Sequence, residues 1–315
     1  MKTPPIIAPL QPADHEAAAR LLHASLVDWY ERRLRQGERF GASAEPFRIF
    51  PDVYAALDPG EAVAARDAAT GELLGVCFVH WRPTHVAFGI VATAPHAGGR
   101  GVARAMMEPA LRRARAEGKP ARLVSSALNL DSFSLYTRLG FVPHTLYQDL
   151  ALTVPAGGMG APPPPGAARV RPARADEARR IAEFEHAWRG VSRERDHAFF
   201  LTNTIGDWRV WVLDDERDPR GEPAGFLVAS HDPRCVMLGP GVARDEVSAA
   251  ALLWAALDAL RGRGVVWLVP CAEAGLVRTL YAWGARNVEL HIASALGAVP
   301  PAQGIAFPTF LPETA

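Results

Sequence analysis

The clearest pattern in the chain is a run of apolar residues that gives way to a helical repeat. Residues 86–93 are mostly apolar and are β-branched or aromatic, as in a buried strand. Residues 95–101 interrupt the run with a proline and three glycines. From 102 to 115 good helix formers dominate, and Val102 and Met106 fall on one side of the predicted helix. The pattern therefore predicts a strand, a glycine-rich turn and a helix in succession.

The same analysis predicts further elements before and after this segment. In the first half we expect strands at 6–10, 62–66, 73–81, 122–127 and 141–152, and a helix at 131–139. Residues 162–165 are four consecutive prolines, which cannot join a helix or a sheet ladder. After them the order begins again, with strands at 209–213, 224–229, 235–240 and 265–269 and a helix at 247–260. We therefore infer an internal repeat, with domains at 1–155 and 167–315 and a semi-rigid linker at 156–166.

Composition narrows the class of protein. The 315 residues are 49% hydrophobic, and 34 basic side chains balance 34 acidic ones. This balance gives no reason to expect nucleic acid or a membrane as a partner. The three cysteines lack CxxC spacing, so we expect no metal site and a reduced, cytoplasmic setting. No apolar run approaches the roughly 20 residues of a membrane span.

The glycine-rich turn has a chemical use. The first N–H groups of a helix lack partners within the helix, and glycines let an anion approach the main chain closely. Two familiar phosphate-binding patterns do not fit. GxxxxGK[ST] fails because no lysine follows the turn, and GxGxxG fails because Arg104 stands where its third glycine is required.

A third pattern fits. Residues 91–107 resemble the coenzyme A signature of the GNAT acyltransferase superfamily, [QR]xxGx[GA], with Gly101 and Ala103 at the small positions. Gly98 stands where Gln or Arg is usual. Residues 127–143 look like the second GNAT signature, NxxAxxLYxxxGF, with Ser132 in place of Ala. The positions that match it are Asn129, Leu135, Tyr136, Gly140 and Phe141.

The resemblance implies an α+β fold of two tandem GNAT-like domains, each a mixed, mainly antiparallel sheet flanked by helices. It implies acetyl-CoA, or another acyl-CoA, as cosubstrate and no metal. The main chain from Gly98 to Arg104 would hold the pyrophosphate, and the edge of Val91 to Thr93 would pair with the pantetheine arm. The cofactor-binding residues that it implies are Val91, Ala92, Thr93, Gly98, Gly99, Arg100, Gly101, Val102, Ala103, Arg104, Asn129, Ser132 and Tyr136.

The activity that the resemblance implies is acyl transfer to an amine of a small molecule or protein by direct attack. Tyr136 takes the family's usual general-acid position and would protonate the leaving thiolate. The alternative is a non-catalytic acyl-CoA sensor or partner-binding module. The acceptor stays open, as does the choice between monomer and homodimer. The base is also open among His80, His85, His96, His144, Asp28, Glu31 and Glu45.

The second half lacks the working turn. Residues 241–249 have a single glycine, and Asp245 and Glu246 stand where phosphates would lie. Carboxylates at the place of a bound diphosphate would repel it, because both groups are negatively charged. The pattern therefore predicts a degenerate C-terminal repeat that does not bind coenzyme A.

Overall fold

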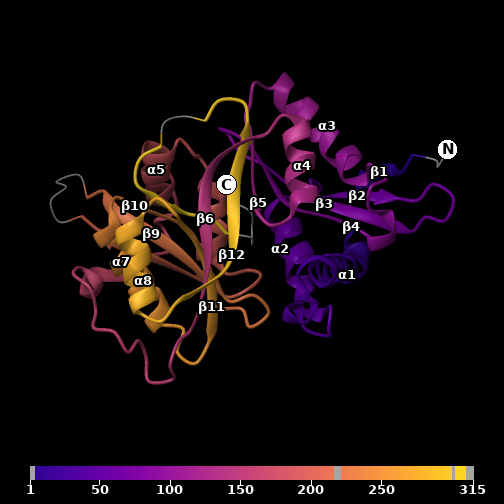
Figure 1. Ribbon diagram of the computed structural model, residues 1–315. Coiled ribbons are helices and arrows are strands. Elements are labelled where there is room, and N and C mark those ends of the chain that lie inside the picture. The colour runs from indigo at the N-terminus through magenta and orange to yellow at the C-terminus, as the bar shows by residue number, and fades with distance from the viewer. Residues whose placement is uncertain (1–3, 216–220, 300–301, 310–315) are drawn as a thin grey trace. The chain divides into compact units, whose positions relative to one another are not determined.

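The computed structural model describes residues 4–215, 221–299 and 302–309. Contacts divide these residues into two compact units (Figure 1). Unit 1 comprises 4–81 and 85–123, and unit 2 comprises 82–84 and the described residues from 124 to 309. None of the helices described combines the length and the apolar character needed to cross a membrane.

Unit 1 is a mixed sheet with helices on both faces. Its strands lie in the order β1 (Ile6–Pro9), β2 (Val63–Arg66), β3 (Leu73–Trp81), β4 (Val86–Thr93) and the start of β5 (Ala121–Ser126). Neighbours are antiparallel except β4 and β5, which are parallel. Gly75 faces α3 (Val102–Ala116), whereas Phe78 stacks on Tyr54 of α2 (Ile49–Leu57). Because side chains alternate along a strand, α3 covers one face and α2, with α1 (His15–Leu34), covers the other (Figure 1).

Unit 2 contains a longer sheet of the same kind. Its order is β12 (Arg286–Leu296), β6 (Val142–Thr153), β11 (Gly264–Pro270), β10 (Met237–Ala243), β9 (Pro223–Ser230), β8 (Trp208–Asp214) and β7 (Val170–Pro172). β13 (Ile305–Phe307) pairs with β10 off this path. The apolar core lies between the sheet and α7 (Glu246–Asp258) with α8 (Ala274–Ala282). On the opposite face Phe226 of β9 packs against α5 (Ala178–Arg189) and α6 (Glu194–Thr202).

The predicted fold class is confirmed: each unit is a mixed, mainly antiparallel sheet flanked by helices. The compact units are not divided at the predicted boundaries of 155 and 167. Strand β6, predicted to complete the first domain, pairs over Tyr147–Thr153 with β11 and over Val142–Ala151 with β12. These pairings assign the residues from 124 onward, including α4 (Leu130–Leu139), to unit 2. The outer limits of the predicted domains, 1 and 315, lie outside the described residues.

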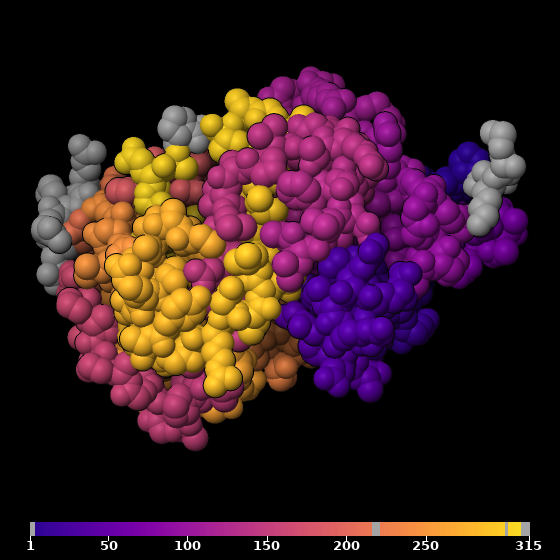
Figure 2. Space-filling view, in the orientation of Figure 1, coloured from indigo at the N-terminus to yellow at the C-terminus, as the bar shows by residue number. Residues whose placement is uncertain are grey.

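The proline-rich linker runs along the surface of unit 2, beside α7 (Figure 2). Met159 N donates to Asp258 Oδ1 at 2.8 Å, and Trp254 Nε1 donates to Ala161 O at 3.1 Å. Both side chains belong to α7: Trp254 lies within the helix, and Asp258 is its last residue. The linker is therefore fastened to unit 2 on both sides of Gly160.

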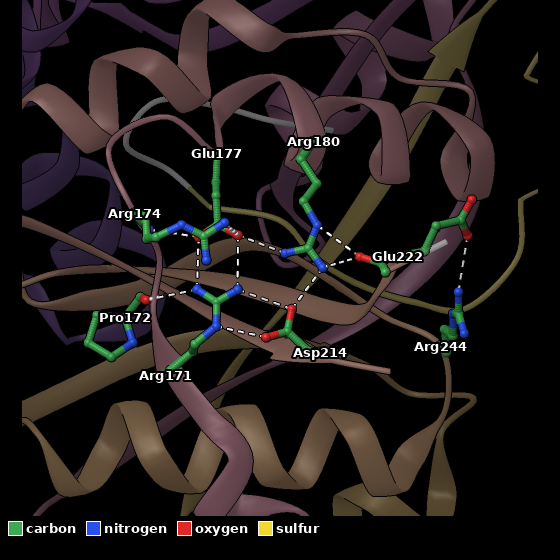
Figure 3. A network of polar contacts seen from close by, with 9 residues as sticks. Arg171, Pro172, Arg174, Glu177, Arg180, Asp214, Glu222 and Arg244 are labelled. Atoms are coloured by element: carbon green, nitrogen blue, oxygen red, sulfur yellow. Dashed lines mark hydrogen bonds and ion pairs between the residues drawn. The ribbon is translucent and has the colours of Figure 1, made fainter. Parts of the chain in front are cut away.

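An ion network fixes the start of α5 to the sheet of unit 2 (Figure 3). Glu177, which is 2% exposed, accepts hydrogen bonds from Arg171 at 2.8 and 2.9 Å and from Arg180 at 2.7 Å. Asp214 of β8 binds the same two arginines at 2.7 Å. Burial raises the pKa of Glu177, but these hydrogen bonds and that of the Arg174 N–H outweigh it and hold the pKa at about 2.

Candidate active site

Strand β4 of unit 1 carries a bulge in its middle. Cys77 pairs with Val91 and Val79 pairs with Phe88, so Gly89 and Ile90 together stand opposite one residue of β3. The parallel pairing with β5 consists of Val86 with Ala121 and Ala87 with Arg122, both before the bulge. A bulge bends its strand and ends regular pairing. Beyond it, the second edge of β4 pairs with no strand among the residues described.

The direction of the backbone groups along this edge follows from one hydrogen bond. Ala94 N donates to Leu74 O of the β3 side at 2.9 Å. Backbone groups alternate in direction along a strand, so the N–H groups of Val91 and Thr93 point away from β3. The segment therefore offers main-chain donors and acceptors to an extended partner.

The turn after β4 has the geometry that the glycines predict. Gly99 and Gly101 have φ of 71° and 78°, in the left-handed region that glycine adopts without steric cost. A Cβ built on either residue would meet no atom within 4 Å, so both face open space. Gly98 has φ of −56°, and its Cβ would meet Pro95 O at 3.5 Å. The turn therefore leaves room directly in front of α3.

The N-terminus of α3 has main-chain donors available. No side chain caps the helix at Gly101, and the first bond of the helical type runs from Ala105 N to Gly101 O at 3.0 Å. The N–H groups of Val102, Ala103 and Arg104 precede that bond. Such groups, together with the helix dipole, form a binding site for an anion.

Close packing holds the first turn of α3 against β3. A Cβ on Gly75 would lie 2.8 Å from Met106 Cε and 3.1 Å from Val102 Cγ1. Gly75 pairs with Thr93 at the end of β4. A side chain at 75 would press on both helix residues, so this glycine allows the close approach of helix and strand.

Arginine charges flank the turn, and each has an acidic neighbour. Arg100 lies 3.8 Å from Asp67, whose pKa is lowered by the N–H groups of Ala69 and Thr70 and by the arginine charge. Arg104 Nε donates to Glu108 at 2.7 Å and lowers the pKa of that carboxyl. Because each arginine has an acidic partner, the main-chain N–H groups contribute more than the arginines to the attraction of an anion.

The residues of the second predicted motif lie in unit 2 and shape α4. Asn129 Oδ1 accepts from Ser132 N at 3.0 Å and so caps the helix. Gly140 ends it with φ of 97°, and Phe141 N donates to Tyr136 O at 3.0 Å. The ring of Tyr136 packs edge-on against Phe141, with 6.1 Å between centroids, and the residue is 8% exposed. The helix caps therefore fix the position of the tyrosine.

Among the predicted base candidates, His80 has the most developed surroundings. His80 Nδ1 hydrogen-bonds Asp58, and the His80 ring stacks on Tyr54 at 4.7 Å. A Cβ on Gly89 would lie 2.6 Å from the Tyr54 hydroxyl, so this group lies directly against the bulge of β4. Tyr54 and Asp58 carry no motif, and the sequence analysis missed them.

The other base candidates have ordinary surroundings. His85 is buried, whereas His96 lies 3.5 Å from Glu72 and His144 contacts Thr145 at 2.9 Å. On and after α1, the acidic candidates Asp28 and Glu31 pair with Arg32 and Arg35, and the N–H of Glu45 donates to Ser43. Burial raises the pKa of Cys77, opposite Val91, to about 12, so this thiol stays protonated and is no nucleophile.

The corresponding turn of unit 2 differs in its length and in its helix cap. Between β10 and α7 stand two residues, Arg244 and Asp245, where eight residues, 94–101, separate β4 from α3. Asp245 Oδ1 accepts from Ser248 N at 2.7 Å and so caps α7 with its own carboxylate. Among the residues described, no group of three or more His, Cys, Asp or Glu is placed to hold a metal ion.

Known families and structures resemble this arrangement. Residues 23–141 match the model of the Acetyltransferase (GNAT) family. No curated protein matches the chain significantly. The fold is similar to a candidate acetyltransferase from Pyrococcus horikoshii, with a TM-score of 0.71 and 15% identity over 95% of this chain and 91% of that one.

Two further structures extend the likeness over both halves. A GCN5-related N-acetyltransferase from Sphaerobacter thermophilus gives a TM-score of 0.61 and 18% identity, covering 95% of this chain and 97% of that chain. A tandem GNAT protein from the clavulanic acid biosynthesis pathway gives 0.58 and 17%, covering 94% and 99%. At these identities the likeness concerns the fold, and the fold includes the tandem arrangement.

Proposed function

The chain belongs to the GNAT acetyltransferase superfamily, with its family domain at residues 23–141, and from this premise we propose that it is an acetyl-CoA-dependent N-acetyltransferase. Its acceptor is an amine of a small molecule or a protein. The observation that carries the proposal is the uncapped N-terminus of α3, which faces open space across Gly99 and Gly101.

Binding of coenzyme A uses the main chain of unit 1. The N–H groups of the turn and of Val102 to Arg104 hold the pyrophosphate, and Arg100 adds charge at its side. The open edge of β4 at Val91 and Thr93 pairs with the amide groups of the pantetheine arm. The residues present suit this ligand because Gly99 and Gly101 leave room that any side chain would reduce.

The chemistry needs a base, a donor to the oxyanion and an acid. We assign the base to His80, whose Nδ1 is held by Asp58, because that bond leaves Nε2 as the proton-accepting nitrogen of the neutral ring. A main-chain N–H in 91–93 stabilises the oxyanion formed when the amine attacks the thioester. Tyr136 then donates its proton to the thiolate; a phenol of pKa about 10 and a thiol of about 8.5 make this transfer feasible.

Tyr136 lies on α4, and the degenerate repeat serves as scaffold. Its turn is short, and the Asp245 carboxylate caps the helix at the place where a second cofactor would put its phosphate. One active site in each chain follows.

The test is thiol release from acetyl-CoA with a panel of amines, followed spectrophotometrically. Release above the rate of hydrolysis with at least one amine is expected, together with the acetylated amine by mass spectrometry. Tight binding of acetyl-CoA without transfer to any amine class would favour the alternative, an acyl-CoA sensor. Absence of binding would contradict the proposal as a whole.

A further inference from the structure

Unit 2 contains a bulged strand pair like that of unit 1. Leu238 pairs with Ala229 and Gly241 pairs with Leu227, so two residues, Gly239 and Pro240, stand opposite Val228. The pairs at the strand end correspond as well: Gly225 with Ala243 in unit 2, Gly75 with Thr93 in unit 1. A bulge at the same place in two repeats indicates that the strand edges beyond the two bulges are equivalent.

The parallel neighbour also leaves at the same place in both units. β10 and β11 pair at Met237 with Val266 and Leu238 with Trp267, and the pairing ends at the bulge. Beyond it, β13 runs antiparallel to β10, with Gly241 opposite Phe307 and Ala243 opposite Ile305. β13 contacts β11 as well. The edge that is open in β4 is therefore occupied in β10 by a strand from the end of the same chain.

Contacts at both ends and along its length hold this strand in place. Gln303 N donates to Trp188 O of α5 at 2.8 Å, and Thr309 Oγ1 lies 3.1 Å from Met237 Sδ. Ile305 and Phe307 are 3% and 1% exposed and belong to the core beneath α7. The segment is part of the folded unit, since its removal would expose apolar side chains.

We propose that β13 takes, in the second repeat, the place of the pantetheine arm, and so covers that strand edge from within the chain. That this place corresponds to the pantetheine arm rests on the proposed function, whereas the pairing of β13 with the edge of β10 does not. Arg244 N donates to Ala224 O at 2.9 Å, as Ala94 N does to Leu74 O. By the same alternation, the N–H groups of Gly241 and Ala243 face β13, whereas those of Val91 and Thr93 point away from β3 on the edge that no described strand pairs with.

Hydrogen exchange of the full chain, read by mass spectrometry or NMR, tests the assignment. Without ligand, the amides of 241 and 243 are expected to be at least about tenfold more protected than those of 91 and 93, relative to intrinsic rates. Addition of coenzyme A protects 91 and 93 and leaves 241 and 243 unchanged.

A glycine pair provides the matched variants. Gly304 has φ of +69°, and a Cβ there would lie 2.5 Å from Ala243 O, whereas Gly262 has φ of +73° and an open surrounding. Both alanine variants introduce the same backbone strain, but only Gly304→Ala presses β13 away from β10. We expect Gly304→Ala to lower protection at 241 and 243 about tenfold and Gly262→Ala to leave it unchanged.

Two results would overturn the assignment: unprotected amides at 241 and 243 in the free protein, or protection there that appears with coenzyme A. Protection of 241 and 243 in the free protein, with no effect of coenzyme A at 91 and 93, would instead contradict the proposed function and leave the closure of β10 by β13 standing.

Discussion

The N-termini of α3 and α7 follow equivalent bulged strands, yet one is open and the other is closed. Before α3 the chain takes eight residues with two glycines of positive φ, and no side chain caps the helix. Before α7 it takes two residues, and the Asp245 carboxylate accepts the Ser248 N–H at 2.7 Å. A carboxylate cap that stabilises a helix also occupies a main-chain donor that could bind a phosphate, and it adds a negative charge there.

The outer edges of β4 and β10 also differ, and again the second repeat is the closed one. Beyond its bulge, the outer edge of β4 pairs with no strand in the part of the chain that the structure describes, whereas β13 covers that of β10. A repeat can therefore keep the bulge, the sheet and the helix while losing its ligand, because those features serve packing as well. The repeat that has lost its ligand differs in three features: a shorter turn, a carboxylate that caps the helix, and an added strand.

The largest effect is expected from copying the closed turn into the open one. Gly101→Asp places a carboxylate at the N-cap of α3, and at about 5 Å from one phosphate charge the repulsion is about 3 kcal/mol at an effective dielectric of 20. We expect the affinity for coenzyme A to fall at least about 100-fold by calorimetry. Gly118→Asp, at another open glycine of positive φ, is the control and should bind normally. Equal binding by both variants would show that the turn does not hold the pyrophosphate.

A pair of tyrosines extends the comparison to the chemistry. Tyr136 precedes Gly140 in α4 as Tyr281 precedes Gly284 in α8, and the Tyr281 hydroxyl hydrogen-bonds Gln148. Tyr136→Phe should lower kcat about 100-fold with the affinity for coenzyme A unchanged, since general-acid catalysis contributes on this order. Tyr281→Phe should leave kcat within about twofold. Steady-state kinetics with a common amine decides, and a fully active Tyr136→Phe would remove the phenol from the mechanism.

The local parts of this site were predictable from sequence, and the long-range parts were not. The turn at 95–101 was predictable because glycine and proline determine backbone geometry within a few residues. The Asp58–His80 pair joins residues 22 positions apart and carries no motif. The pairing of β6 with β11 and the three-residue β13 depend on contacts across the chain, which a pattern of apolar residues does not specify.

A smaller effect is expected from the ion network that anchors α5 in the repeat without a cofactor turn. Glu177→Gln removes the charge shared by Arg171 and Arg180, and we expect a loss of about 2 kcal/mol in the free energy of unfolding. The pKa of Glu177 is lowered in the folded state to about 2, so its contribution is complete above the ordinary value of 4.5. That contribution is lost as the pH falls from about 4.5 to about 2.

Denaturant unfolding of both proteins across this range measures the difference, which should shrink toward acid. Glu183→Gln on the same helix is the control, because its pair with Arg179 is exposed. A difference that is independent of pH would exclude the charge of Glu177 as its source.

The smallest effect concerns the cap itself. Asp245→Ala should lower the stability of the protein by about 1 kcal/mol, whereas Asp245→Asn keeps an acceptor for Ser248 N and should lose little. Neither variant should gain a second binding event for coenzyme A, because β13 still covers β10. Thermal unfolding and calorimetry check the two statements separately. A second event in Asp245→Ala would show that the cap alone keeps the repeat closed.

The stoichiometry of the unaltered chain tests the central claim most directly. One open turn and one closed turn predict a single molecule of coenzyme A for each chain in a calorimetric titration. Two molecules for each chain would show that the second repeat binds as well, and no heat at any concentration would show that the open turn of α3 is not a coenzyme A site.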